Sequence, residues 1–298
     1  MIIFTAPNMK ADTAANSTSL TPLHELQGSG LFGQISKVAT NLRTYWFLVQ
    51  QLVKVEMQVE FRRSFLGMGW LLIVPLVAVA VWILLNGAGV ISPGDTGIPY
   101  PAYVLLSTSI WGFFAEAYRR CGRLIESYGR LLLSTPFPVE TLFAQAVIVH
   151  LIRFVIPLGL NLLVLLIFGV RFTAAALLFP FALLPLLLLG CGFGLLIAPL
   201  RLIATDITRI SDEGIRLLMY LTPIVYAPKV EISFLASIIA LNPLTYLVGF
   251  PRDLLTKGQF FEPVTFGLCS LGSLLFFLIA LWLFRTSEAR VRERLIAN

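Results

Sequence analysis

The sequence predicts an all-α integral membrane protein, and three observations lead to this fold class. Of the 298 residues, 57% are hydrophobic and 13% are charged, whereas soluble domains carry about 25% charged residues. The mean hydropathy is +0.86. Two apolar runs, 141–170 and 172–198, follow each other almost without a break. Each is longer than the roughly 20 residues that a helix needs to cross a hydrocarbon core, so together they predict a transmembrane hairpin.

Six transmembrane helices are expected, within one transmembrane domain that covers residues 61–298. The predicted spans are 70–91, 100–118, 139–169, 173–198, 214–228 and 264–284. Between the last two spans, residues 234–240 and 244–250 are apolar but too short to cross. We expect two short re-entrant helices there.

The N-terminal region divides into two parts. Residues 1–34 are rich in Ser, Thr, Asn and Gly and have little to bury, which indicates a disordered cytoplasmic tail. Residues 35–60 place apolar side chains at helical spacing on one face and Lys, Asn and Gln on the other. This pattern predicts an amphipathic helix that lies at the membrane interface.

The distribution of basic residues predicts the topology. The N-terminal region up to residue 70, the 119–138 and 199–213 loops and the C-terminal tail hold sixteen of the twenty-two Lys and Arg residues. The loops on the other side hold four. Positive charge favours the cytoplasmic side, so both termini are expected in the cytoplasm. The net charge of +6 then reflects topology and does not indicate nucleic-acid binding.

The sequence lacks the common catalytic motifs. It contains no GxxxxGK[ST], no HExxH and no GxSxG, and its three cysteines lie far apart. We therefore expect a non-catalytic protein that holds no metal or cofactor. A secondary transporter is disfavoured because no predicted span carries a carboxylate near its middle.

One charge, Arg153, lies deep in a predicted span and shares a helix face with His150. Arg153 could contact an anionic group in transit, or it could be a structural arginine paired with backbone carbonyls or with another helix. Aromatic residues allow two similar interpretations, since they could stack on sugar rings or form the usual interfacial belt. The aromatic residues concerned are Trp70, Trp82, Trp111, Phe113, Phe114, Tyr118, Tyr220 and Tyr226.

Five stretches, in order from about residue 35 to the end, resemble one family, the ABC-2 type permease subunits that export O-antigen, capsular polysaccharide or teichoic acid. Residues 61–75 resemble its basic-Ser-x-Leu-Gly-x-x-Trp-x-x-x-x-Pro opening, and 110–114 its Pro-Trp-x-Phe-Phe stretch, with Ile110 in place of proline. Leu-Ile at 124–125 with Phe-Pro at 137–138, Thr-Pro-Ile-Val-Tyr at 222–226 and Asn-Pro at 242–243 complete the series. The paired lysines common after Leu-Ile are absent.

The resemblance implies a type V exporter in the bacterial inner membrane. It would be a homodimer of this chain bound to two cytoplasmic ABC ATPase subunits that hold ATP and Mg. The amphipathic helix would be an interface or gate helix, and helices one and five would line a channel for a lipid-linked polysaccharide. The helix at 124–133 would couple to the ATPase. The residues implied for that coupling are Leu124, Ile125, Glu126, Tyr128, Arg130 and Leu131.

The resemblance also implies roles in substrate binding. The candidates for glycan contact in the channel are Trp82, Tyr220, Tyr226, Phe113 and Phe114. Candidates for the pyrophosphate headgroup are Arg62, Arg63 and Arg216, since the planar guanidinium offers paired donors to phosphate. Arg62 and Arg63 could equally serve topology and bind lipid headgroups. The alternatives for the whole chain are an ABC-2 permease for a small lipid or drug and a non-ABC secondary transporter.

Overall fold

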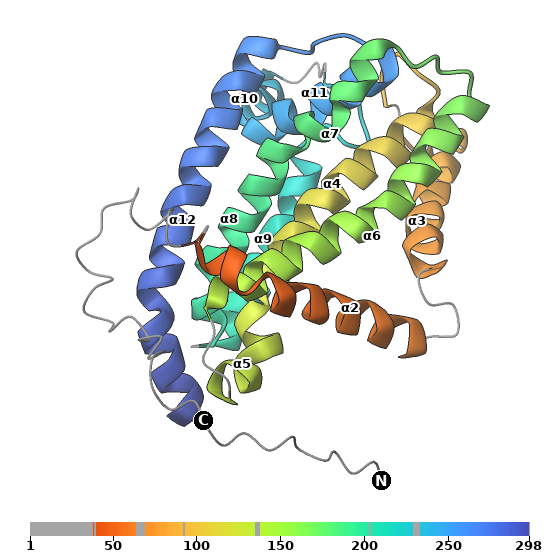
Figure 1. The fold of residues 1–298 in the computed structure, drawn as a ribbon. Coiled ribbons are helices and arrows are strands. Elements are labelled where there is room, and N and C mark those ends of the chain that lie inside the picture. The colour runs from red at the N-terminus through yellow and green to blue at the C-terminus, as the bar shows by residue number, and fades with distance from the viewer. Residues whose placement is uncertain are drawn as a thin grey trace, which may run out of the picture.

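A computed structural model describes residues 38, 40–63, 69–91, 93–134, 138–202, 204–228 and 233–297. Within these ranges the regular elements are all helices (Figure 1). They are α2 (Trp46–Arg63), α3 (Trp70–Gly87), α4 (Tyr100–Gly122), α5 (Leu124–Ser134), α6 (Val139–Ile167), η3 (Ala174–Leu178), α7 (Phe179–Ala182), α8 (Leu184–Arg201), α9 (Thr205–Tyr220), α10 (Ser233–Leu241), α11 (Pro243–Lys257) and α12 (Pro263–Ala297).

The chain runs back and forth between two ends of a helix bundle, which we call the α5 end and the α11 end (Figure 1). Helix α4 is the central element, and it packs mainly on α8 and α6, with α3 beside it. Helix α12 lies along α8. Helix α2 lies across the bundle near the α5 end and packs on α6 (Figure 1).

Three helical stretches are long and apolar enough to cross a membrane: Val139–Ile167, Ala174–Arg201 and Pro263–Ser287. Helices α10 and α11 meet the same test only together, and they are bent by 78° at their junction. The chain is therefore a membrane protein. The count of six spans stays a prediction, because α3 and α9 are shorter and α4 carries charged residues near its C-terminal end.

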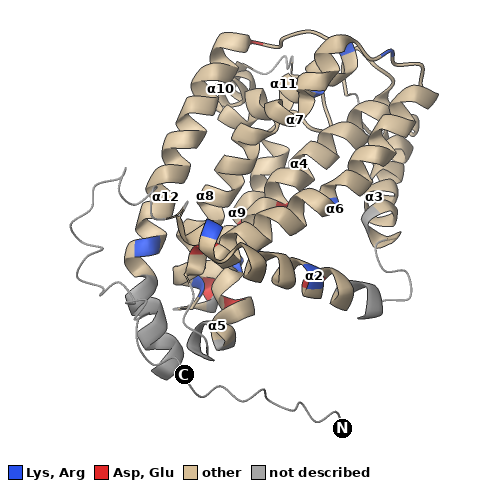
Figure 2. Ribbon diagram, in the orientation of Figure 1, with Lys and Arg blue, Asp and Glu red and all other residues tan. Residues whose placement is uncertain are grey.

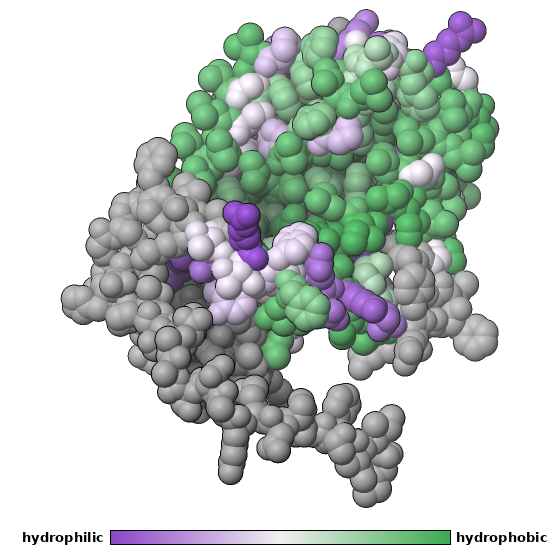
Figure 3. All heavy atoms as spheres, in the orientation of Figure 1, coloured by the Kyte–Doolittle hydropathy of each residue, from purple (hydrophilic) through white to green (hydrophobic). Residues whose placement is uncertain are grey.

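The surface agrees with a membrane environment. Lys, Arg, Asp and Glu gather mostly around the α5 end (Figure 2). Hydrophobic side chains cover most of the face above α2 in Figure 3, with hydrophilic ones along α2. On α12, Leu268, Leu275 and Ile279 are exposed, as expected for side chains that face lipid.

Several elements differ from their predicted ranges. The predicted tail, 1–34, lies outside the described residues, and α2 ends three residues after the predicted interface helix. Helix α9 begins well before the predicted fifth span and ends at Tyr220, so 221–228 is irregular. Pro223 has no N–H to donate, which disfavours a continued helix. The C-terminal basic segment is not a separate tail, since α12 continues to Ala297.

Glycines allow α4 and α8 to approach closely. A Cβ atom at Gly190 would lie 2.7 Å from the carbonyl oxygen of Phe114, and one at Gly194 would lie 2.6 Å from the carbonyl oxygen of Tyr118. Both distances are too short for real atoms, so only glycine fits. The two glycines are one helical turn apart and form the small-residue spacing that packs membrane helices.

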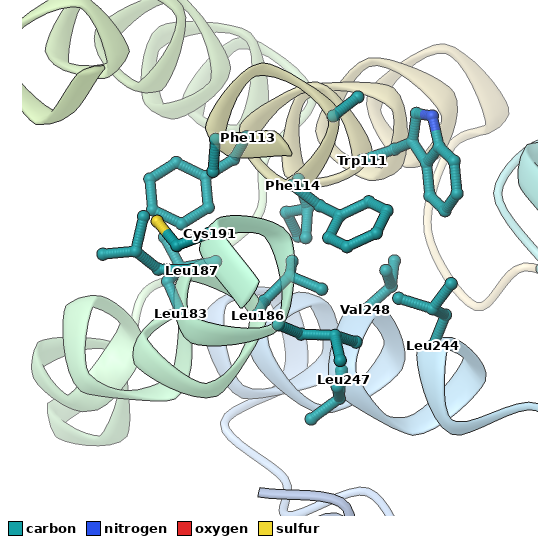
Figure 4. Close-up of a cluster of buried hydrophobic side chains, with 14 of the residues drawn as sticks. Trp111, Phe113, Phe114, Leu183, Leu186, Leu187, Cys191, Leu244, Leu247 and Val248 are labelled. Carbon is teal, nitrogen blue, oxygen red and sulfur yellow. The ribbon is translucent and has the colours of Figure 1, made fainter. Parts of the chain in front are cut away.

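The core is built around the middle of α4. Figure 4 shows Trp111, Phe113 and Phe114 of α4 facing side chains of α8 and α11, among them Leu186 and Leu247. The rings of Trp111 and Phe114 lie 5.2 Å apart in a tilted arrangement. Because membrane helices gain little from hydrophobic burial, such close packing supplies much of their association.

The glycine contact leads to a stability prediction. We expect Gly194→Ala to lower the thermal melting temperature of the detergent-solubilised protein, because the new methyl group would force α4 and α8 apart. Overpacking of this kind costs about 1–3 kcal/mol. Gly272→Ala, in open space on α12, is the matched control. A Gly194→Ala protein that melts with the control would contradict this packing.

Candidate functional site

A polar cluster at the α5 end joins four helices, and we call it the Glu56 cluster. Glu56 of α2 accepts hydrogen bonds from Arg120 Nη1 of α4 at 2.8 Å and from the Tyr128 hydroxyl of α5 at 3.0 Å. Gln145 of α6 also donates to it, and Arg153 Nη2 of α6 lies 3.9 Å away. One carboxylate thus ties α2, α4, α5 and α6 together.

The environment keeps Glu56 ionised. Burial by itself raises the pKa of Glu56, but the hydrogen bonds and charge of Arg120, with those of Gln145 and Tyr128, lower it overall below its ordinary value. Burial and the nearby carboxylate raise the pKa of Tyr128. At neutral pH the tyrosine is therefore a donor and the glutamate an acceptor, as their contact requires.

An open cleft lies beside the Glu56 cluster. Its volume is about 550 Å³, and its walls come from α2, α4, α5 and α6. Leu52, Val55 and Val59 of α2 form an apolar side. Arg119 and Arg123 line the α4 side, with Glu116 paired to Arg119 at 2.9 Å. The cleft separates part of α2 from α5.

A second cluster forms around Arg252 of α11, towards the α11 end, and we call it the Arg252 cluster. Only 3% of Arg252 is exposed. Its Nη1 atom donates to the Tyr103 hydroxyl at 2.8 Å and to the carbonyl oxygen of Pro223 at 3.0 Å. Its Nε atom lies 3.3 Å from Asp253. The guanidinium also lies 4.5 Å from the ring centre of Tyr103.

The Arg252 cluster satisfies the irregular backbone that follows α9. Tyr100 donates to the carbonyl oxygen of Val225 at 3.0 Å, and Tyr103 donates to that of Tyr226 at 2.9 Å. Asn242 reaches the Thr222 hydroxyl at 3.0 Å. Buried non-helical backbone needs hydrogen-bond partners, and these side chains supply them here.

A third buried charge, Arg201, fastens the end of α8 to α9. Its side chain is fully buried, and its Nη2 atom lies 2.6 Å from Asp212. The Tyr118 hydroxyl donates to the same carboxylate at 2.9 Å. Elsewhere, Arg285 of α12 pairs with buried Glu140 of α6 at 2.8 Å.

The residues predicted to couple to an ATPase fall on two sides of α5. Leu124 and Ile125 are each only 2% exposed and lie in the core, so they do not present a docking surface in this structure. Tyr128 is half-buried and faces Glu56, and Leu131 packs on the core. Glu126 is exposed. The side chain of Arg130 lies outside the described residues.

The aromatic residues predicted to contact a glycan fall into a buried group and an exposed group. Phe113 and Phe114 are buried at 3% and 0% exposure, and Phe113 packs on His150 with ring centres 4.5 Å apart. They belong to the core of this chain, so neither ring is open to a glycan in this structure. Tyr220 is 53% exposed. Trp82 and Tyr226 are partly exposed.

The predicted arginine sites do not meet at one place. Arg216 is exposed on α9 and lies 3.3 Å from Glu213. Arg62 and Arg63 lie in the last turn of α2, and their side chains are outside the described part of the chain. Arg153 is largely buried beside Glu56, which favours the structural interpretation of this arginine.

Sequence reasoning missed Glu56 and Arg252. Glu56 is one of several charges in an amphipathic helix, and nothing local distinguishes it. The predicted short helix 244–250 ends before Arg252, yet α11 continues through Pro251 to Lys257. Tyr103, the partner of Arg252, is 149 residues away in the sequence. Among the residues that the structure describes, no group of three or more His, Cys, Asp or Glu side chains could hold a metal ion.

The Arg252 cluster generates a second stability prediction. Arg252→Met should destabilise the protein by about 3–5 kcal/mol, as expected when one partner of a buried charged network is removed. Arg216→Met, on an exposed pair, should change stability by less than about 0.5 kcal/mol. Thermal melting in detergent would compare the two. Equal melting temperatures for both variants would show that Arg252 does not hold the α11 end together.

The sequence is similar to those of three known proteins. No protein-family model matches the sequence. The chain is 26% identical over 214 residues to the "O-antigen export system permease protein RfbA" of Myxococcus xanthus, covering 71% of this chain and 81% of that protein. Two Klebsiella pneumoniae proteins of the same name are 22% and 21% identical, and each comparison covers 74% of this chain and 85% of the relative. The resemblance to polysaccharide-export permeases is therefore confirmed: the chain is similar over most of its length to proteins named O-antigen export permeases.

Proposed function

We propose that this chain is the membrane subunit of an ATP-driven ABC exporter that moves a lipid-linked polysaccharide out of the cytoplasm. Two copies would form the pathway, and two separate ATPase subunits would bind ATP and Mg and hydrolyse the ATP. The similarity to O-antigen export permeases over about three quarters of the chain is the observation that carries this proposal.

Helix α5 supports the ATPase partnership. It lies outside the three apolar spans at one end of the bundle, between α4 and α6 (Figure 1). Leu124 and Ile125 anchor it in the core, while Glu126 and Ser127 stay exposed. A short helix held in this way can act as a rigid lever when a bound ATPase closes on ATP.

The charge distribution supports the orientation. Charged residues gather around the α5 end (Figure 2), and positive charge favours the cytoplasmic side of a membrane. In our proposal the α5 end faces the bacterial cytoplasm, the α11 end lies at the outer surface of the inner membrane, and both chain termini are cytoplasmic.

The exposed faces of α3 and α9 suit the pathway between two copies. Helix α3 exposes Val74, Val77 and Leu84, and α9 exposes Leu217 and Tyr220. Helix α9 also exposes charged residues in its first turns, which lipid would not accommodate. In the proposed homodimer these faces meet around the channel, with Tyr220, Trp82 and Tyr226 as the remaining candidates for glycan contact.

Co-purification tests the proposal most directly. Tagged permease expressed with a candidate ABC ATPase from the same organism should yield a stable complex whose ATP hydrolysis in lipid vesicles rises at least twofold with lipid-linked glycan. A complex that ignores glycan but responds to a small lipid or drug would favour that kind of permease. Failure to bind any ATPase would overturn the ABC assignment and favour a secondary transporter.

The role of α5 can be tested separately. Glu126→Arg should leave a folded permease and reduce ATPase binding at least tenfold, because it reverses charge on the exposed face of α5. Leu124→Asp should instead reduce the yield of folded protein, since an unpaired charge in the core is costly. Size-exclusion chromatography and pull-down would separate the two effects. Undiminished ATPase binding by Glu126→Arg would remove this face from the interface.

A further inference from the structure

We propose that Glu56 is a positioning residue that couples the movement of α5 to α2, through the hydrogen bond that it accepts from Tyr128. This inference rests on the proposed function, because it assigns the path by which force from an ATPase on α5 would reach the amphipathic helix. It names a linkage between two elements that the sequence pattern left independent.

The two carboxylate oxygens of Glu56 accept hydrogen bonds from three other helices. Its Oε2 atom accepts from Tyr128 of α5 at 3.0 Å, and its Oε1 atom accepts from Arg120 of α4 at 2.8 Å. Gln145 of α6 donates to Oε2 as well. The two oxygens are thus held from different helices, so a shift of any one helix must move Glu56 or break a charge-assisted hydrogen bond.

The cleft beside the Glu56 cluster shows that α2 and α5 pack incompletely there. Helix α2 packs chiefly on α6, with Val49 fully buried. The side chains of Glu56, Tyr128 and Gln145 line the cleft of about 550 Å³ between α2, α4, α5 and α6. Packing between α2 and α5 is therefore incomplete near the cluster. The hydrogen bond bridges this gap, and motion of α5 reaches α2 through it.

The surroundings of Glu56 strengthen its hydrogen bond with Tyr128. The Tyr128 hydroxyl donates to an ionised carboxylate that is partly buried, where such bonds are stronger than on an exposed surface. The same carboxylate is paired with Arg120, which also lies 2.9 Å from Glu116. If α5 moved without α2, Glu56 would lose the hydrogen bond that it accepts from Tyr128. The low-energy motion is for α2 and α5 to move together.

Hydrogen exchange of the purified permease in lipid nanodiscs tests the linkage without any partner. Tyr128→Phe changes α5, yet it should raise amide exchange in α2 at least fivefold, because α2 loses one of its ties. Glu56→Gln should do the same. Tyr246→Phe is the matched control, since it removes a tyrosine hydroxyl bond to the carbonyl oxygen of Ala240 at the other end of the molecule. Unchanged α2 exchange in Tyr128→Phe would overturn the proposal.

A transport assay tests what the linkage does. In the reconstituted complex with its ATPase, Tyr128→Phe and Glu56→Gln should lower the glycan exported per ATP hydrolysed at least fivefold relative to wild type and Tyr246→Phe. A residue with a purely structural role would lower export and ATP hydrolysis in parallel. If the wild-type complex exports no glycan, the proposed function fails, while the exchange experiment still decides whether α2 and α5 are linked.

Discussion

The requirement that buried charge be paired across helices governs this structure more than any other constraint. An unpaired ion is costly in an apolar bundle, and three of the ion pairs described above join separate elements. Glu56 with Arg120 joins α2 to α4, Arg201 with Asp212 joins α8 to α9, and Glu140 with Arg285 joins α6 to α12. These pairs fix which helices are neighbours, and the close contact at Gly190 and Gly194 fixes how near α4 and α8 lie.

The two ends of the bundle use polar groups for different purposes. At the α11 end, Arg252, Tyr100 and Tyr103 satisfy carbonyl oxygens of the irregular segment after α9, which gives a rigid break. At the α5 end, the Glu56 cluster holds four helices beside an open cleft. A rigid end and an end with room to move suit a transporter that is driven from one side. This contrast underlies the proposed exporter function.

The proposed transfer of force from α5 to α2 depends on a hydrogen bond at a place where the two helices do not pack closely. The first turn of α5 is anchored in the core by Leu124 and Ile125. Helix α2 is held along α6, and its Glu56 side chain meets Tyr128 of α5 beside the cleft. Hydrogen bonds tolerate small rearrangements better than close-packed side chains do, because they can lengthen or exchange partners without steric clash. A polar linkage between two moving helices is therefore a reasonable design for a cycle that repeats with each ATP.

The sequence by itself determined the membrane class and the short helix between α4 and α6, because these depend on local composition and backbone chemistry. It also indicated the resemblance to polysaccharide-export permeases, through motifs that are local in sequence. Only the tertiary structure decided that Leu124, Ile125, Phe113 and Phe114 are core residues, since apolar residues at a helix surface and in a core look alike in a sequence. It alone showed the roles of Glu56 and Arg252. Arg120 lies 64 residues from Glu56, and Tyr103 lies 149 residues from Arg252. No local pattern encodes contacts that arise when distant helices pack together.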